Sequence, residues 1–210
     1  MLVNCSVKEF IEQVDSAKPA PGGGSVAALV GALGISLSGM YGHLTVGKKV
    51  FEQLDDSTKK DFAKALEQLH VLENKLLGLV DEDAKLYPKI LASYRLPKIT
   101  EEEQKLRAQA IYEATILAIE GPYTIAKCAY EALEQIEILL PFGNKNAISD
   151  AACAIVLLEA TIETAIINME INLASLEDQS YKNAIISLRK HTKEKKEKMM
   201  AIAHPWKVEE

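Results

Sequence analysis

Apolar side chains recur at spacings of three and four residues through the middle of this chain. Between residues 55 and 91 the recurring positions are Phe62, Leu66, Leu69, Leu72, Leu76, Val80, Ala84, Tyr87 and Leu91. Because this spacing places apolar side chains on one face of an α-helix, it predicts an amphipathic helix over residues 55–91. Pro88 lies inside the pattern and should kink or break the helix, since proline lacks the main-chain hydrogen-bond donor.

The rest of the chain shows the same helical spacing. We expect a short helix capped by Ser6 and a helix over residues 100–140 that restarts at Gly121-Pro122. A long helix over residues 147–176 and a charged C-terminal helix follow. No segment alternates with the two-residue period of a β-strand. The pattern therefore predicts an all-α protein.

One segment, residues 25–47, contains no formally charged side chain if His43 is neutral. A run of 23 such residues is long enough to cross a bilayer. Small residues that would let another helix approach closely recur in it at Ala27, Gly31, Gly34, Ser38 and Gly42. We identify no second such run. We therefore expect the long apolar central helix of a soluble helical bundle or of an oligomer interface, with a membrane-associated protein as the alternative.

The composition fits a folded cytosolic protein. Hydrophobic residues make up 48% and charged residues 26% of the 210 positions, which supports one globular domain over residues 1–210. The net charge of −6 argues against a nucleic-acid surface. The dispersed Cys5, Cys128 and Cys153 form no disulfide framework, and the four histidines lack metal-ligand spacing. Because the N-terminus also lacks the uncharged core of a signal peptide, we expect a cytoplasmic protein without a metal site.

The loop Lys18-Pro-Ala-Pro-Gly-Gly-Gly-Ser25 directly precedes the apolar helix. Glycines before a helix expose main-chain N–H groups, and the helix dipole favours an anion there. The prolines stiffen the loop, and Ser25 can cap the helix. No Gly-Lys-Ser/Thr follows, so this is not a P-loop. We treat Gly22 to Ser25 as a candidate ligand-contact loop, with a tight turn between helices as the alternative.

Two pairs of cations lie beside predicted helix ends. Lys48 and Lys49 come where the apolar helix ends, and Arg95 and Lys98 flank Pro97. Either pair could bind a carboxylate of a substrate, and the two pairs could share that task. The alternative for Lys48 and Lys49 is a solvated pair that complements the helix dipole.

Three consecutive acidic residues, Asp81, Glu82 and Asp83, lie in the helix predicted over residues 55–91. At about 100° per residue, Glu82 points away from the apolar stripe, Asp83 lies close to its edge and Asp81 lies to one side. An inward carboxylate needs a partner, which makes Asp83 the sharper candidate for acid–base chemistry. A buried salt bridge or cap is the alternative, and Glu73 also projects onto the apolar side.

Polar residues share one face of the helix predicted over residues 147–176: Asp150, Thr161, Asn168 and Asn172. Asp150 and Asn168 are about 27 Å apart along a straight helix, so they cannot meet one small reacting centre within it. Either they belong to different sites, or a second subunit brings one end of the helix to the other's site. Asn144, just before the helix, could cap it.

Taken in order, these motifs resemble those of the cyclodeaminase family. That family forms the C-terminal half of formiminotransferase-cyclodeaminase and also occurs as stand-alone bacterial proteins, several known as methenyltetrahydrofolate cyclohydrolases. The matching segments are Pro19-Ala-Pro-Gly-Gly-Gly-Ser25, Gly47-Lys-Lys49, Asp81-Glu-Asp-Ala84, Arg95-Leu-Pro-Lys98, Gly143-Asn-Lys-Asn146 with Ser149-Asp150, and Asn168-Met-Glu-Ile-Asn-Leu173. Each is weak by itself, whereas six in the same order are difficult to obtain by chance.

The resemblance implies an all-helical homodimer that acts on a reduced folate, with or without a polyglutamate tail, and needs no cofactor. In the cyclodeaminase reaction, N10 of 5-formiminotetrahydrofolate attacks the formimino carbon and ammonia leaves, giving 5,10-methenyltetrahydrofolate. The cyclohydrolase adds water to the methenyl bridge and gives 10-formyltetrahydrofolate. The alternative is a non-catalytic helical protein that binds a ligand or serves as a scaffold. Neither a membrane nor a nucleic acid is an expected partner.

The resemblance also implies roles for individual residues. Asp83, Asp81 or Asp150 would transfer the proton. The implied substrate-binding residues are Gly22, Gly23, Gly24, Ser25, Lys48, Lys49, Arg95, Lys98, Asn144, Asn168 and Asn172. Among them, the four cations would meet the anionic glutamate tail. Some relatives carry a histidine shortly after Gly-Lys-Lys, where this chain has Phe51-Glu52-Gln53, so no histidine base is expected.

Overall fold

The computed structural model describes residues 1–174, 176 and 178–205. Its α-helices are α1 (Val7–Val14), α2 (Gly23–His43), α3 (Lys49–Glu52), α4 (Asp56–Tyr94), α5 (Glu101–Leu139), α6 (Ile148–Leu173) and α7 (Gln179–Ala203). Its short 3-10 turns are η1 (Leu2–Asn4), η2 (Leu140–Phe142) and η3 (Lys145–Ala147). The described residues contain no β-strand, which confirms the predicted all-α class.

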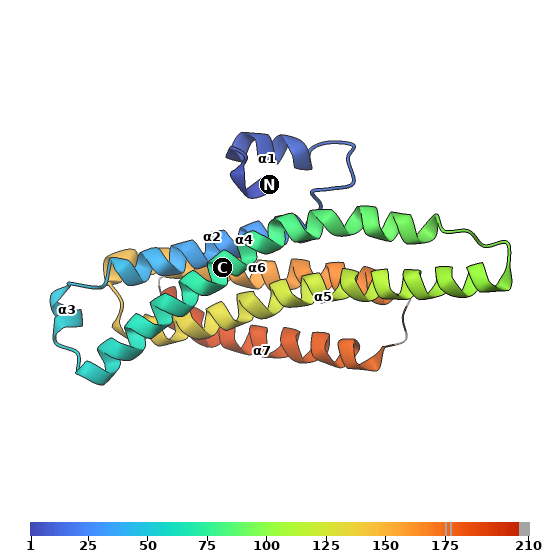
Figure 1. The fold of residues 1–210 in the computed structure, drawn as a ribbon. Coiled ribbons are helices and arrows are strands. Elements are labelled where there is room, and N and C mark those ends of the chain that lie inside the picture. The colour runs from blue at the N-terminus through green and yellow to red at the C-terminus, as the bar shows by residue number, and fades with distance from the viewer. Residues whose placement is uncertain (175, 177, 206–210) are drawn as a thin grey trace, which may run out of the picture.

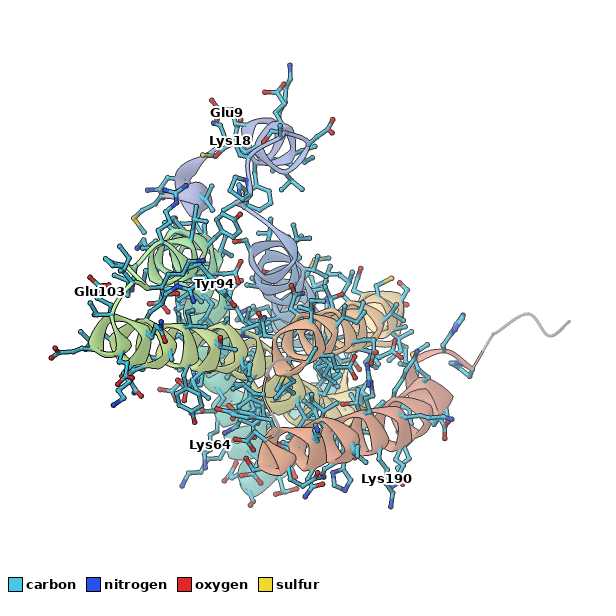
Figure 2. All side chains as sticks on the ribbon, turned by 90° about the vertical axis from the view of Figure 1, so that its right-hand side faces the viewer. Glu9, Lys18, Lys64, Tyr94, Glu103 and Lys190 are labelled. Atoms are coloured by element: carbon cyan, nitrogen blue, oxygen red, sulfur yellow. The ribbon has the colours of Figure 1, made fainter. Side chains whose placement is uncertain are left out.

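Four long helices form the body of the molecule. α2 packs against α4 and α6, and α5 packs against the same two helices to complete a helical bundle. α7 lies along α6, while α1 stands off from the bundle (Figure 1). Figure 2 looks along the bundle and shows Glu9 and Lys18 on this outlying segment. The turn between α4 and α5 projects beyond the ends of α6 and α7 (Figure 1).

The core lies between α2, α4, α5 and α6. Its largest fully buried side chains are Tyr41, Phe62, Ile35, Leu69, Leu76, Ile119, Ile125, Leu133, Ile136, Leu139, Ile155 and Leu158. The stripe predicted for residues 55–91 is buried as far as Val80, but Tyr87 and Leu91 are exposed. These last positions lie on the projecting end of α4, beyond the level at which α2 begins to cover it.

α2 is apolar on all sides, yet one of its faces is open to solvent. A Cβ on Gly42 would overlap the Leu66 side chain of α4, so the small residues serve close helix packing, as their spacing predicted. On the outer face, Leu33 and Met40 are 54% and 46% exposed. The segment Lys145–Leu173 is also long and apolar enough to cross a membrane, so the prediction of a single such run was wrong. Half of each segment is buried within the protein.

The helix boundaries follow the capping signals but ignore two predicted breaks. Ser6 and Thr100 both form capping boxes at the starts of α1 and α5. α4 continues through Pro88, so of the predicted kink or break the break was wrong, and α5 continues through Gly121 and Pro122, so the predicted restart was wrong as well. A proline inside a helix costs about 3 kcal/mol. Each of these helices has 39 residues and packs against other long helices of the bundle, and this packing offsets that cost.

Candidate active site

Asp83 on α4 is hydrogen-bonded to the start of α2. Its Oδ2 accepts hydrogen bonds from the Ser25 main-chain N–H at 2.7 Å and from the Ser25 hydroxyl at 2.9 Å. The same hydroxyl lies 2.9 Å from the Val80 carbonyl oxygen, so its single hydrogen is shared between two acceptors. Asp83, expected at the edge of the apolar stripe, is half-buried and joins α4 to α2.

The glycines before Ser25 leave space that side chains of other helices fill. A Cβ on Gly24 would overlap Asp83 Oδ1. A Cβ on Gly23 would lie 3.0 Å from both polar atoms of the Asn168 side chain, which comes from α6. A side chain at position 24 would therefore displace Asp83, whereas one at position 23 would fit only if the Asn168 side chain shifted slightly.

α2 begins three residues earlier than its capping signal predicted. Gly22 is the N-cap, Gly23 is already helical, and Ser25 lies buried within the first turn, so the prediction that Ser25 caps the helix was wrong. The anionic group at this helix N-terminus is the carboxylate of Asp83, placed where the helix dipole stabilises negative charge.

Asp81 is more deeply buried than Asp83. It is 7% exposed, and its Oδ1 accepts a hydrogen bond from the Leu2 N–H at 2.6 Å. Its Oδ2 has no hydrogen-bond partner among the residues that the structure describes. Helical projection placed Asp81 to one side of the stripe. It missed the burial because the covering turn η1 comes from outside the helix.

α6 adds two amide side chains to the same region. Asn168, beside Gly23, donates to the Thr164 carbonyl at 2.8 Å. One helical turn further on, Asn172 donates to the Ala118 carbonyl of α5 at 3.3 Å. α2, α4 and α6 thus bring predicted site residues together around the start of α2. We call this set the glycine-loop cluster: Gly22, Gly23, Gly24, Ser25, Asp81, Asp83, Asn168 and Asn172.

A groove of about 550 Å³ between α4 and α5 adjoins this cluster. Its apolar walls are Leu79, Leu86, Leu117 and Ile125. Two glycines, Gly78 and Gly121, also line the groove. Its polar lining residues are Asn74, Lys75, Glu82, Asp83, Glu120 and Thr124. Because Asp83 belongs to both the cluster and the groove, a molecule in the groove can reach the carboxylate that Ser25 holds.

Four predicted site residues lie at the opposite end of α2. Lys48 and Lys49 are exposed there, beyond the C-terminus of a helix about 30 Å long. The Asn144 side chain donates to the Leu44 carbonyl at 3.1 Å, and Asp150 lies in the first turn of α6 shortly after it. We call Lys48, Lys49, Asn144 and Asp150 the lysine-end cluster. Within one chain, this cluster cannot meet the glycine-loop cluster.

Two buried side chains that the sequence analysis missed hold the segment that carries Asn144. Thr45 Oγ1 accepts a hydrogen bond from the Asn144 N–H at 2.9 Å, and the Tyr41 hydroxyl donates to the Leu140 carbonyl at 3.2 Å. A Cβ on Gly143 would overlap the Tyr41 ring, and burial raises the pKa of Tyr41 to about 12. The sequence signal that could have found them was the spacing of Tyr41 and Thr45, two hydroxyl-bearing residues four positions apart in the uncharged segment.

Arg95 and Lys98 lie in the connection between α4 and α5, where both are exposed. Arg95 is about 18 Å from Asp83 along α4, while the whole of α4 is about 58 Å long. Lys48 and Lys49 precede the other end of that helix. The two cation pairs of one chain are therefore too far apart to bind one carboxylate together, contrary to the shared task considered from the sequence.

The glycine-loop cluster combines carboxylates, amides and a hydroxyl, which can orient a ligand and transfer protons. Among the described residues, no group of three or more histidine, cysteine, aspartate and glutamate side chains could hold a metal ion. Cys128 is fully buried, and burial raises the pKa of its thiol. Fold and cluster together define a helical-bundle protein with a carboxylate site on a glycine-rich helix start.

Comparison with known proteins places this chain within that class. A sequence model of the formiminotransferase-cyclodeaminase family matches residues 6–198, and the chain belongs to this family. It is 33% identical over 181 residues to a methenyltetrahydrofolate cyclohydrolase of Methylorubrum extorquens, covering 86% of this chain and 85% of that protein. The resemblance inferred from the motifs is therefore confirmed.

Two further relatives define the extent of the match. The formimidoyltransferase-cyclodeaminase of Rattus norvegicus is also 33% identical over 181 residues, but this chain spans only 33% of its length. The crystal structure of a formiminotetrahydrofolate cyclodeaminase from Thermotoga maritima superposes with a TM-score of 0.79 at 24% identity, covering 98% of this chain and 96% of that one. The latter similarity establishes the shared helical fold.

Proposed function

We propose that this protein is a tetrahydrofolate one-carbon enzyme that forms or opens the methenyl bridge between N5 and N10. The observation that carries the proposal is the Asp83 carboxylate, held by Ser25 at the edge of a groove in a chain of this family. The first candidate reaction is formiminotetrahydrofolate cyclodeamination. The second candidate is methenyltetrahydrofolate hydrolysis, which is favoured by the match to the Methylorubrum protein over 86% of this chain and 85% of that protein.

Both reactions need a proton to move at a tetrahedral carbon that lies between two nitrogens. In cyclodeamination, N10 attacks the carbon of the formimino group, whose nitrogen is protonated, and N10 then loses a proton, which the departing amine takes up to leave as ammonia. In hydrolysis, water adds to the methenyl carbon and loses a proton, and N5 is protonated as its bond to that carbon breaks. A positioned carboxylate can carry the proton in either case, an effect worth about 10²–10⁴ in rate.

Asp83 is our first candidate for this carboxylate, since it lies both in the groove and against the glycine loop. Asp81 is the second, because one of its oxygens is bonded to Leu2 and the other has no partner among the described residues. Asp150 lies in the lysine-end cluster and could act only on a substrate bound at another copy's glycine loop. Asn168, which lies beside Gly23 on α6, would orient the substrate.

A homodimer would let Asp150 of one copy reach the glycine loop of the other. Leu33 and Met40 on α2, with Val156 and Ile167 on α6, are exposed apolar side chains on two helices that pack together. A two-fold axis crossing α2 near Leu33 would run the two α2 helices antiparallel, since a two-fold contact uses the same patch on both copies. The lysine-end cluster of one copy would then approach the glycine-loop cluster of the other.

The remaining features complete the proposal. The glutamate tail of the folate, single or polyglutamylated, would meet Arg95 and Lys98 of the same chain or Lys48 and Lys49 of a second copy. The reaction would use no cofactor beyond the reduced folate. A net charge of −6 and free cysteines support a cytoplasmic enzyme that binds neither nucleic acid nor a membrane.

The decisive experiment supplies 5-formiminotetrahydrofolate and 5,10-methenyltetrahydrofolate separately. Ammonia release from the first identifies a cyclodeaminase, and loss of methenyl absorbance with the second identifies a cyclohydrolase. Asp83→Asn should lower kcat by about 10²–10⁴, whereas Asp61→Asn, at an exposed position of the same helix, should not. Binding of folate without turnover of either substrate would instead support a non-catalytic ligand-binding protein.

A further inference from the structure

The groove between α4 and α5 contains a glycine that the fold does not require. No heavy atom lies within 4 Å of the position that a Cβ on Gly78 would occupy, so an alanine side chain would fit there. Gly121 faces the same groove, and a Cβ there would make only an ordinary contact of 3.5 Å with Leu86. Glycine is the least favourable helix residue after proline, yet both positions lie inside long helices.

The side chains around these glycines suit one end of a flat, polar ring. Leu79, Leu117 and Ile125 supply apolar walls, while Glu120 on α5 and Asp83 on α4 bring carboxylates from the two sides of the groove. The pyrimidine part of a reduced pterin carries an N–H and an amino group side by side. Such a donor pair fits a single carboxylate through two parallel hydrogen bonds.

We infer that the groove is the pterin subsite and that Glu120 holds the pyrimidine edge of the ring. This inference rests on the proposed function, which it extends by assigning an orientation to the substrate. With Asp83 serving the reacting carbon from α4, the far edge of the ring faces α5, where Glu120 lies. Gly78 and Gly121 then keep open the space that the ring occupies.

The direction of the anionic tail follows from the charges along the hairpin. Glu82, Asp83 and Glu120 surround the pterin end and would repel the glutamate carboxylates, with Lys75 as the cation at that end. A second groove of about 310 Å³ continues the first, since Leu86 and Leu117 line both, and its charged residues are Lys89 and Glu113, so it lacks the excess of carboxylates found at the pterin end. Further along the same hairpin come Arg95 and Lys98. The tail is therefore directed toward the turn between α4 and α5.

Gly78→Ala gives the sharpest test. If the glycine had only a structural role, the alanine would stabilise α4 and leave binding unchanged. If the groove is the pterin subsite, the variant should still melt at a higher temperature. It should also bind tetrahydrofolate at least tenfold more weakly, measured by isothermal titration calorimetry. Unchanged affinity in a stabilised variant would overturn the inference.

A second pair of variants tests the orientation. Glu120→Gln should weaken binding of tetrahydrofolate and of a tail-free tetrahydropterin equally, by about tenfold to a hundredfold, since a hydrogen-bonded charge is lost. Lys89→Gln should weaken binding of tetrahydrofolate alone. Glu134→Gln, exposed on α5 outside the groove, is the matched control. If Glu120→Gln binds both ligands normally, the assignment fails, whereas a wild type that binds neither ligand refutes the proposed function itself.

Discussion

The Asp83 carboxylate occupies the space in which a side chain on Gly24 would begin. The same carboxylate accepts two hydrogen bonds from Ser25, so the start of α2 and the middle of α4 are fitted to each other at a single side chain. A loop whose glycines first suggested an open anion site is therefore already occupied by an anion of the protein. A substrate would therefore meet the Asp83 carboxylate and not a free glycine loop.

Gly24→Ala should remove most of the activity. The added methyl group overlaps Asp83 Oδ1 and must displace the carboxylate or the helix start, because a packed interior cannot absorb it. We expect a fall in kcat similar to that of Asp83→Asn and a loss of stability of about 1–3 kcal/mol, measured by denaturant unfolding. Gly39→Ala makes the same change in α2 where no atom lies within 4 Å, and it should keep the wild-type activity without any loss of stability.

Stability at high pH should depend on Tyr41. Its pKa is raised to about 12 by burial, above the value near 10 expected in the unfolded chain. Between these values the unfolded chain releases a proton that the folded protein retains, so the free energy of unfolding should fall as pH rises from 10 toward 12. Urea unfolding across this range should show a smaller fall for Tyr41→Phe than for the wild type. An identical pH dependence in both proteins would contradict this assignment.

Leu2→Pro should detach the N-terminal segment without unfolding the bundle. Proline removes the N–H that Leu2 donates to the buried Asp81 carboxylate, and Phe10 is the one buried residue of α1. We expect faster alkylation of Cys5, which is partly buried in the wild type, measured site by site by mass spectrometry. The buried Cys128 provides the internal control, and its slow rate should not change. Acceleration at both cysteines would indicate global unfolding instead.

Leu33→Glu should convert the proposed dimer into monomers. Leu33 is 54% exposed at the middle of the open face of α2, where a two-fold contact would bury two carboxylates against each other. Analytical ultracentrifugation should show half the wild-type mass with an unchanged helical spectrum. Val71→Glu, at a 54% exposed position of α4, is the matched control and should remain dimeric. A monomeric wild type would refute the proposed dimer directly.

Helix periodicity predicted much of the fold because it depends on residues close together in the sequence. The stripe over residues 55–91 marked the buried face of α4 as far as Val80, and the capping boxes at Ser6 and Thr100 marked two helix starts. The periodic pattern held through Pro88, and the expectation that failed was the break, which the local effect of proline favoured. Periodicity itself failed at Tyr87, which shows the right spacing but lies where no third helix covers α4.

The sequence by itself determined the all-α class, the family and the set of polar residues from which the site is drawn. Only the tertiary structure decided which of them meet. It placed Asp83 against Gly24 and buried Asp81 beneath Leu2. It also separated Lys48 from both, at the far end of α2. The reason is physical: helical spacing fixes the side of a helix on which a residue lies, whereas the neighbour that covers that side comes from a distant part of the chain.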